Sequence, residues 1–211
     1  MAKTFKKIFD TVSNTALVLC VLLVVLIVGV RLVGIEPHIV LSGSMEPEIM
    51  TGSLVYVRPL SAEEARQLQA GDTVTYVVNK SGTKVTHKIY EVVGTAYVKN
   101  QRGEYVLDAD GQPKVATDDL GNPIVMYTTY GVNNKSASSE SGYVLDGTPG
   151  VGNLASSNVV GKPVFTIPLL GYVANFVQNS PGRYVATAVC AILLFNSFCG
   201  DLFKRDRNTE A

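Results

Sequence analysis

A run of apolar residues near the amino terminus constrains the fold most. Between Val12 and Val33 the chain carries one charged residue, Arg31, in a stretch dominated by valine and leucine. Roughly 20 apolar residues in a helix cross the hydrocarbon core of a bilayer. Arg31 lies close enough to the end of the run for its head group to reach the interface. The sequence therefore predicts a transmembrane helix over residues 12–34, after an amino-terminal segment of residues 1–11.

A cleavable signal peptide is the alternative interpretation of this run, because it also combines a basic start with an apolar core. The run is long for a signal peptide, and the residues that follow it, from Arg31 to Ile35, contain no Ala-x-Ala cleavage pattern. These features favour a retained membrane anchor.

A second apolar run, Tyr184 to Phe198, is shorter and is interrupted by Asn196. It needs help from its flanks to cross a bilayer. We predict a second transmembrane helix over residues 183–200, followed by a tail of residues 201–211. Basic residues gather at both ends of the chain, which predicts two spans with both termini in the cytoplasm and a lipid bilayer as a partner. These residues are Lys3, Lys6, Lys7, Lys204, Arg205 and Arg207.

Composition excludes several classes of function. The chain has 18 basic and 18 acidic residues, a balance that indicates no nucleic-acid partner. Cys20, Cys190 and Cys199 all lie in the two predicted transmembrane helices, which excludes a disulfide-built extracellular module and a cysteine metal site. His38 and His87 are the only histidines, and no glycine-rich phosphate motif is present. We therefore expect neither a metal nor a cofactor.

The middle of the chain, residues 35–182, reads as an antiparallel, mainly β domain. Its segments are rich in β-branched residues and are separated by turn residues such as Asn, Gly and Asp. Ser61 and Glu64 form a capping-box pattern that predicts a short helix. We expect this helix at 61–70, strands at 37–41, 52–57, 73–78, 83–93 and 159–165, a turn at 79–82, two more hairpins within 97–130 and an irregular loop at 133–158.

Two residues of this middle segment form a possible catalytic pair. A serine hydroxyl is a poor nucleophile at neutral pH and needs a base that takes its proton. Ser44 lies in a Ser-Gly-Ser turn, and His87 lies in a predicted strand on the same face as Val85 and Ile89. On spacing alone, an ordinary turn and an ordinary strand histidine remain open as alternatives.

Several short motifs, in a fixed order, resemble those of the type I signal peptidases. The resemblance runs through nearly the whole middle segment, and an ordered set of this kind is more specific than any one tripeptide. The motifs are Ser42-Gly43-Ser44-Met45-Glu46-Pro47, Gly52-Ser53-Leu54-Val55-Tyr56-Val57, Gly71-Asp72-Thr73-Val74-Thr75-Tyr76, Thr86-His87-Lys88-Ile89, Val160-Gly161-Lys162-Pro163 and Ile167-Pro168-Leu169-Leu170-Gly171.

A histidine at position 87 resembles the endoplasmic-reticulum-type subtype of that family, because the commoner bacterial enzymes carry a lysine base there. The resemblance implies a membrane-bound serine endopeptidase that removes signal peptides from exported preproteins. It implies Ser44 as the nucleophile and His87 as general base and then general acid. It also implies an oxyanion hole made by the backbone N–H of Ser44 and the hydroxyl of Ser42.

The acid that orients the histidine is the point of departure from the family pattern. The family has a Gly-Asp-x-Asn box followed by a second aspartate, whereas this chain has Gly131-Val132-Asn133-Asn134. We expect Asp146 to supply the acid, because it stands between this box and the Val160-Gly161-Lys162 motif. Asp118, Asp119 and Glu140 stay open as alternatives.

Substrate recognition, by the same resemblance, pairs an extended peptide with exposed strand edges. The edges on offer are residues 37–41 and 83–87. Ile39 and Val85 are the candidates for lining shallow pockets that accept small residues before the cut, as in Ala-x-Ala sites. The resemblance implies secretory preproteins as partners, met as they emerge from the translocation channel.

Two other functions are compatible with the same features. Loss of the box aspartate is also expected in a catalytically inactive, membrane-tethered β domain that acts as a scaffold or interaction module. A self-cleaving repressor-type Ser/Lys protease of related fold is the third possibility, and the two predicted anchors disfavour it.

Overall fold

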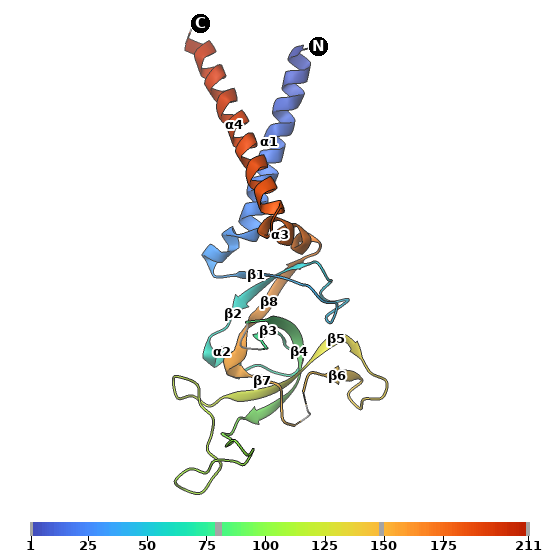
Figure 1. Ribbon diagram of the computed structural model, residues 1–211, viewed down its shortest axis with the longest axis vertical. Coiled ribbons are helices and arrows are strands. Elements are labelled where there is room, and N and C mark those ends of the chain that lie inside the picture. Colours follow the sequence, from blue (N-terminus) through green and yellow to red (C-terminus); the bar gives the residue numbers. More distant parts are fainter. Residues whose placement is uncertain (1, 79–81, 148–149, 210–211) are drawn as a thin grey trace. The chain divides into compact units, whose positions relative to one another are not determined.

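The computed structural model describes residues 2–78, 82–147 and 150–209. It describes the side chains of all these residues except 2, 3, 5, 6, 10 and 196–209. Most of the turn predicted at 79–82 lies outside the described residues. The chain forms two compact units (Figure 1). A helical unit contains residues 1–33 and 172–211, and a β unit contains Gly34–Gly171.

The helical unit contains α1 (Ala2–Ile27) and α4 (Gly182–Thr209). The segment Lys7–Ile27 of α1 is long and apolar enough, by length and composition, to cross a membrane. The α-helix ends seven residues before the predicted boundary at 34, because the chain tightens into the 3-10 helix η1 (Gly29–Val33). The apolar part of α4, Gly182–Phe195, is shorter than a full span. A crossing by α4 therefore stays a prediction.

The β unit confirms the expected antiparallel sheet. Within the described residues, eight strands form one sheet in the order β1-β2-β8-β3-β4-β5-β6, and β7 pairs with β5 (Figure 1). The first strands are β1 (Glu36–Ile39), β2 (Leu54–Pro59), β3 (Thr73–Val77) and β4 (Lys84–Thr95). They are followed by β5 (Val125–Lys135), β6 (Tyr143–Leu145), β7 (Leu154–Ala155) and β8 (Val159–Ile167).

Helices of the β unit are short. Helix α2 (Ala62–Arg66) begins with the predicted capping box, in which Ser61 and Glu64 bond each other's backbone N–H groups. It ends earlier than expected, because Leu68 turns into the core beside Tyr76 and Tyr127. The 3-10 helix η2 (Ser156–Asn158) leads into β8. Helix α3 (Leu170–Gln178) begins within the segment that the sequence assigned to the β domain.

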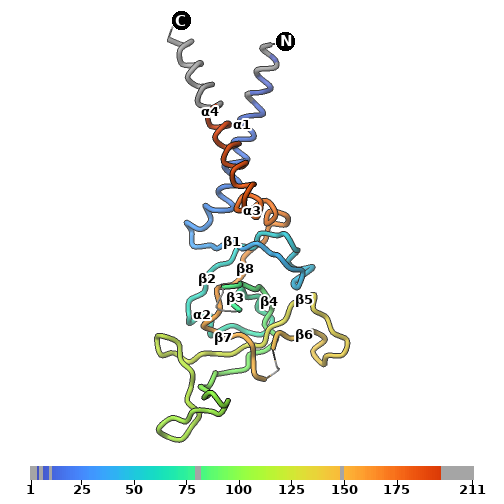
Figure 2. The backbone as a smooth tube through the Cα atoms, viewed as in Figure 1, coloured from blue at the N-terminus to red at the C-terminus, as the bar shows by residue number. Residues whose placement is uncertain are grey.

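The segment between β4 and β5 is a closed module rather than a pair of ordinary hairpins (Figure 2). Between Tyr97 and Ile124, all of them described, it contains three turns of one design, at 100–104, 108–112 and 118–122. In each turn the side-chain oxygen of the first residue accepts hydrogen bonds from backbone N–H groups two and four residues later.

Two rings of backbone hydrogen bonds close this module. Ala96 donates to Ile124, Ile124 donates to Ala116, and Ala116 donates back to Ala96. A second ring links residues 98, 114 and 106 in the same way. The module is also joined to α2 by the Arg66–Asp118 ion pair, at 3.1 Å.

A close approach between β2 and β8 makes Gly161 sensitive to substitution. A Cβ atom at this position would lie 2.1 Å from the carbonyl oxygen of Arg58, which is backbone and cannot rotate away. We expect Gly161→Ala to lower the free energy of unfolding by about 3 kcal/mol, measured by chemical denaturation. Gly111→Ala is the control, because open space surrounds Gly111 and an added Cβ atom meets no other atom. Its positive φ should cost an alanine only about 1 kcal/mol. An equal loss in the two variants would contradict this account of the β2–β8 contact.

Candidate active site

Ser44 lies in the loop between β1 and β2, and residues of β5 hold the backbone of that loop. The backbone N–H of Asn133 donates to the Ser44 carbonyl at 2.8 Å, and its side-chain amide donates to the Gly43 carbonyl at 3.0 Å. At Gly131, a Cβ atom would lie 2.7 Å from the Ser44 carbonyl oxygen, so only glycine allows this approach. The segment Gly131–Asn134 thus holds the backbone carbonyl groups of Gly43 and Ser44 in place.

Polar and apolar contacts inside the loop complete its support. The Glu46 carboxylate accepts hydrogen bonds from the backbone N–H and the hydroxyl of Thr51, at 3.0 and 2.7 Å. Met45 points the other way, into an apolar cluster with Ile49, Val55 and Val57 against which Val132 packs. Val132 occupies the position of the box aspartate, so in this chain that position serves packing and not polar contact.

His87 extends from β4 toward the loop and is 7% exposed. Its Nε2 atom lies 2.9 Å from the Ser44 hydroxyl oxygen, and its Nδ1 atom lies 2.5 Å from Asp146 Oδ2. Lys88, the next residue on the strand, pairs with Glu48 of the nucleophile loop at 2.6 Å. The strand and the loop are therefore joined at the point where the serine meets the histidine.

Asp146 follows β6 and is held against β5. Its backbone N–H donates to the Thr129 carbonyl at 2.8 Å, and its Oδ2 atom accepts the Thr129 hydroxyl at 2.6 Å. Burial acts to raise the pKa of Asp146, but the hydrogen bonds from His87 and Thr129 outweigh it and hold the pKa below its ordinary value. The carboxylate is thus ionised and can only accept, so the proton on His87 resides on Nδ1. Nε2 is then free to accept the proton of Ser44.

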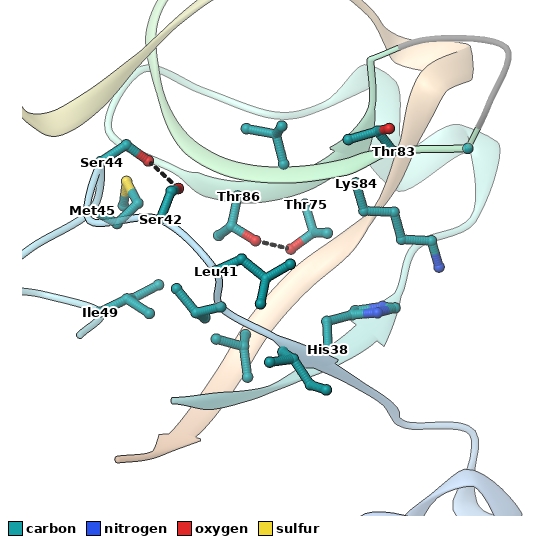
Figure 3. Close-up of a pocket in the computed structure, with 15 residues that line it drawn as sticks. His38, Leu41, Ser42, Ser44, Met45, Ile49, Thr75, Thr83, Lys84 and Thr86 are labelled. Carbon is teal, nitrogen blue, oxygen red and sulfur yellow. Dashed lines mark hydrogen bonds between the residues drawn. The ribbon is translucent and has the colours of Figure 1, made fainter. Parts of the chain in front are cut away.

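The structure brings Ser44, His87 and Asp146 together and leaves the alternative acids elsewhere. Asp118 is engaged with Arg66, and Asp119 and Glu140 are exposed. Ser42 stands beside the nucleophile, with 3.5 Å between the two hydroxyl oxygens (Figure 3). Within the described residues, no group of three or more His, Cys, Asp or Glu side chains is placed to hold a metal ion.

A cavity of about 500 Å³ extends from Ser42 and Ser44 along the edges of β1 and β4. Ile39 of β1 and Val85 of β4, the two residues expected to contact substrate, both line it. Figure 3 shows Ser42, Ser44 and Met45 at one end of the cavity and the hydrogen-bonded pair Thr75 and Thr86 in its middle, beside Leu41. Pairing of β4 with β5 starts only at Lys88, so among the described residues one edge of β4 carries no strand between residues 84 and 87.

The side chains of Lys84 and His38 lie at the end of this cavity away from Ser44 (Figure 3). Lys84 on β4 reaches across to Glu36 on β1 at 2.9 Å, and His38 contacts the same carboxylate at 3.2 Å.

Sequence reasoning missed the residues that support the site from behind. Asn133 lies in the Gly131–Asn134 segment, so its place in a motif could have identified it as a residue of the site. Tyr76 also ends one of the motifs, residues 71–76, although nothing in that motif indicates its contact with Thr129. Thr129 and Asn153 lie in no motif, and their contacts depend on the register of β5 and on the return of a distant loop.

Acid is expected to weaken the fold through Asp146. Its folded pKa lies below the unfolded value of about 3.9, so its charge stabilises the fold above that pH and this contribution is lost as pH falls through the folded pKa. Asp146→Asn should therefore cost more unfolding free energy at about pH 5 than at about pH 2.5, measured by denaturant titration at both pH values. The same cost at both would mean that the charge of Asp146 is not stabilised in the fold.

Comparison with known proteins gives one informative similarity. No family model matches the chain. Over 104 residues the chain is 34% identical to signal peptidase I W of Bacillus subtilis (strain 168). The match covers 45% of this chain and 53% of that protein, so the chain spans about half the length of the curated relative it matches. The chain is thus similar, over that region, to a bacterial signal peptidase I.

Proposed function

We propose that this protein is a membrane-bound serine endopeptidase that removes N-terminal signal peptides from exported preproteins. The observation that carries the proposal is the run of contacts from Ser44 through His87 to Asp146. A hydroxyl, an imidazole and an ionised carboxylate in hydrogen-bond reach form an activated nucleophile. The similarity to a signal peptidase I supports the choice of substrate.

The reaction follows from the positions of the protons. Nε2 of His87 takes the proton of Ser44 as the hydroxyl oxygen attacks the carbonyl carbon of the scissile bond. The oxyanion that forms accepts hydrogen bonds from the backbone N–H of Ser44 and the hydroxyl of Ser42. His87 then protonates the leaving amine as the C–N bond breaks, and water releases the acyl group by the reverse sequence. Asp146 keeps Nδ1 protonated and stabilises the imidazolium.

We infer specificity for small residues before the cut from the resemblance to the signal peptidases, and the cavity beside Ser44 is where these residues would bind. A peptide that pairs with β1 and β4 places alternate side chains toward Ile39 and Val85. Cleavage after Ala-x-Ala sites follows. We also propose the histidine subtype of the signal peptidases, because the base in this chain is His87.

Membrane attachment is the second part of the proposal. The apolar segment Lys7–Ile27 of α1 supports one span. We assign the second span to residues 183–200 and both termini to the cytoplasm, since basic residues favour that side. The catalytic domain then lies on the extracytoplasmic or lumenal face, where preproteins leave the translocation channel.

Turnover by the full chain in lipid vesicles tests the proposal. The substrate is a preprotein with an Ala-x-Ala site, and mass spectrometry of the product identifies the new amino terminus. We expect cleavage after the second alanine by the wild type, and none by Ser44→Ala or on a substrate with leucine at both alanine positions. A wild type as inactive as Ser44→Ala would favour the scaffold function instead.

Ser42 offers a test of the oxyanion hole. Ser42→Ala removes one donor to the developing charge, and we expect kcat to fall about 100-fold with little change in KM. Ser42→Thr retains the hydroxyl and should keep most of the activity. If Ser42→Ala stays within about twofold of the wild type, the Ser42 hydroxyl is not an oxyanion donor.

A further inference from the structure

A buried polar group lies directly behind the acid of the site and takes no part in the reaction as described above. Thr129 is 0% exposed and projects from β5 toward Asp146. Its hydroxyl is 2.6 Å from Asp146 Oδ2, the same oxygen that meets His87 Nδ1. One carboxylate oxygen therefore accepts from the histidine and from the threonine together.

The neighbours of Thr129 determine which way its hydroxyl points. Its backbone N–H donates to Asn153 Oδ1 at 2.9 Å, which turns the amide nitrogen Nδ2 toward the Thr129 hydroxyl oxygen, 3.0 Å away. Tyr76 approaches the same oxygen at 2.9 Å. Burial raises the pKa of Tyr76 to about 12, so the phenol keeps its proton and serves as a donor.

The 2.6 Å contact with Asp146 is the shortest that the Thr129 hydroxyl makes, which favours one arrangement of its proton. A hydroxyl has a single proton and two lone pairs. The Thr129 hydroxyl also lies 3.4 Å from Asn153 Oδ1, and the Tyr76 hydroxyl lies 3.4 Å from Asp146 Oδ2. Because the contact between Thr129 and Asp146 is much shorter, at 2.6 Å, we assign the Thr129 proton to Asp146, with Asn153 and Tyr76 donating to its lone pairs. The carboxylate receives a donor in a fixed direction from a side chain that is completely buried and bonded on all sides.

We propose that Thr129, held by Tyr76 and Asn153, is a positioning residue that keeps the Asp146 carboxylate oriented toward His87 Nδ1. The inference rests on the proposed function of the site. It accounts for how a chain with valine at position 132 supports its acid, since Val132 packs in the apolar cluster with Met45 and offers no polar atom. Support comes instead from β3, β5 and the loop before β7.

Thr129→Val tests this directly, because it removes the hydroxyl and nearly preserves the shape. We expect kcat to fall about 10- to 100-fold, the value of one hydrogen bond to a charged group, with KM within about twofold of the wild type. Thr129→Ser restores a hydroxyl and should recover most of the rate. Thr129→Ala removes the hydroxyl without filling the space, and it replaces the valine variant if that one does not fold.

Thr128→Val is the matched control. Thr128 is the adjacent residue of β5, is equally buried, and also donates its hydroxyl to a carboxylate, that of Glu91 at 2.9 Å. Adjacent residues of a strand point to opposite faces, and the Thr128 hydroxyl bonds Glu91 instead of Asp146, so its loss should leave kcat unchanged. Equal falls in kcat for the Thr128 and Thr129 variants would show a general effect on the sheet and overturn the proposal.

A second readout does not depend on turnover. The full chain has two histidines, so labelling histidine with ¹⁵N gives one set of NMR signals for His87 and one for His38 as an internal reference. In the wild type at neutral pH we expect the neutral ring of His87 to carry its proton on Nδ1. In Thr129→Val the proton should divide between Nδ1 and Nε2, and Thr129→Ser and Thr128→Val should resemble the wild type.

The two failures can be told apart. If the wild type cleaves, Ser44→Ala does not, and Thr129→Val matches the wild type in both rate and ring tautomer, the positioning role is wrong and the proposed function stands. If the wild type does not cleave, the proposed function fails. The tautomer measurement then still decides whether Thr129 controls the contact between Asp146 and His87.

Discussion

Ser44→Ala and His87→Ala are each expected to lower kcat for signal-peptide cleavage by about 10⁵- to 10⁶-fold. The reason is that the two side chains act as one unit across a single 2.9 Å contact. Without the hydroxyl there is no acyl acceptor, and without the imidazole the hydroxyl keeps its proton at neutral pH. Single-turnover kinetics with a labelled preprotein, at saturating enzyme, measures the loss without interference from product release.

The double variant sharpens this prediction. Because either substitution already removes the nucleophilic route, Ser44→Ala combined with His87→Ala should be no slower than either variant alone. Ser138→Ala is the control, since this serine is exposed in the loop before β6. Multiplying losses would mean that the two residues contribute independently, and the assignment of a serine–histidine pair would be wrong.

Asp146→Asn is expected to lower kcat by about 10⁴-fold and to leave KM nearly unchanged. The carboxylate accepts both the Nδ1 proton of His87 and the hydroxyl proton of Thr129. An amide has lost the negative charge and can turn its NH₂ group toward the ring. That amide would hold the neutral ring with its proton on Nε2, where it cannot accept the proton of Ser44.

The controls for this prediction are the acids that the sequence left open. Asp119→Asn and Glu140→Gln alter exposed side chains, so both should cleave at the wild-type rate. The measurement is kcat by initial rates on the same preprotein. A loss of less than about tenfold for Asp146→Asn would show that the histidine does not need this carboxylate, whatever their proximity.

The sequence predicted the parts of the site that lie in motifs. Ser44, His87 and Ser42 stand in short segments whose order along the chain carries the resemblance, so residue type and position were enough to select them. Asp146 was selected by its place between two such segments. Its contact with His87 depends on the pairing of β6 with β5, which no local pattern in residues 133–158 reveals.

What the sequence could not predict depends on distant parts of the chain coming together. Thr129 looks like any threonine of a strand, and its role emerges only when Asn153 returns to β5 and Tyr76 reaches across from β3. Helix α2 is shorter than its pattern because Leu68 gains more from the core than from another helical turn. The antiparallel sheet was predictable from alternation and turn residues, whereas its strand order, with β8 between β2 and β3, was not.

The rings of hydrogen bonds that close the module between β4 and β5 determine where the chain can change in length. Ala96 and Ile124 are bonded to each other where the chain leaves and rejoins the sheet. This hydrogen bond holds β4 and β5, the strands that carry His87 and Thr129, at a fixed separation where the module begins and ends. Changes of length beyond residues 96 and 124 should therefore leave the spacing of the reactive groups unaltered, which makes the module a suitable place to insert a reporter.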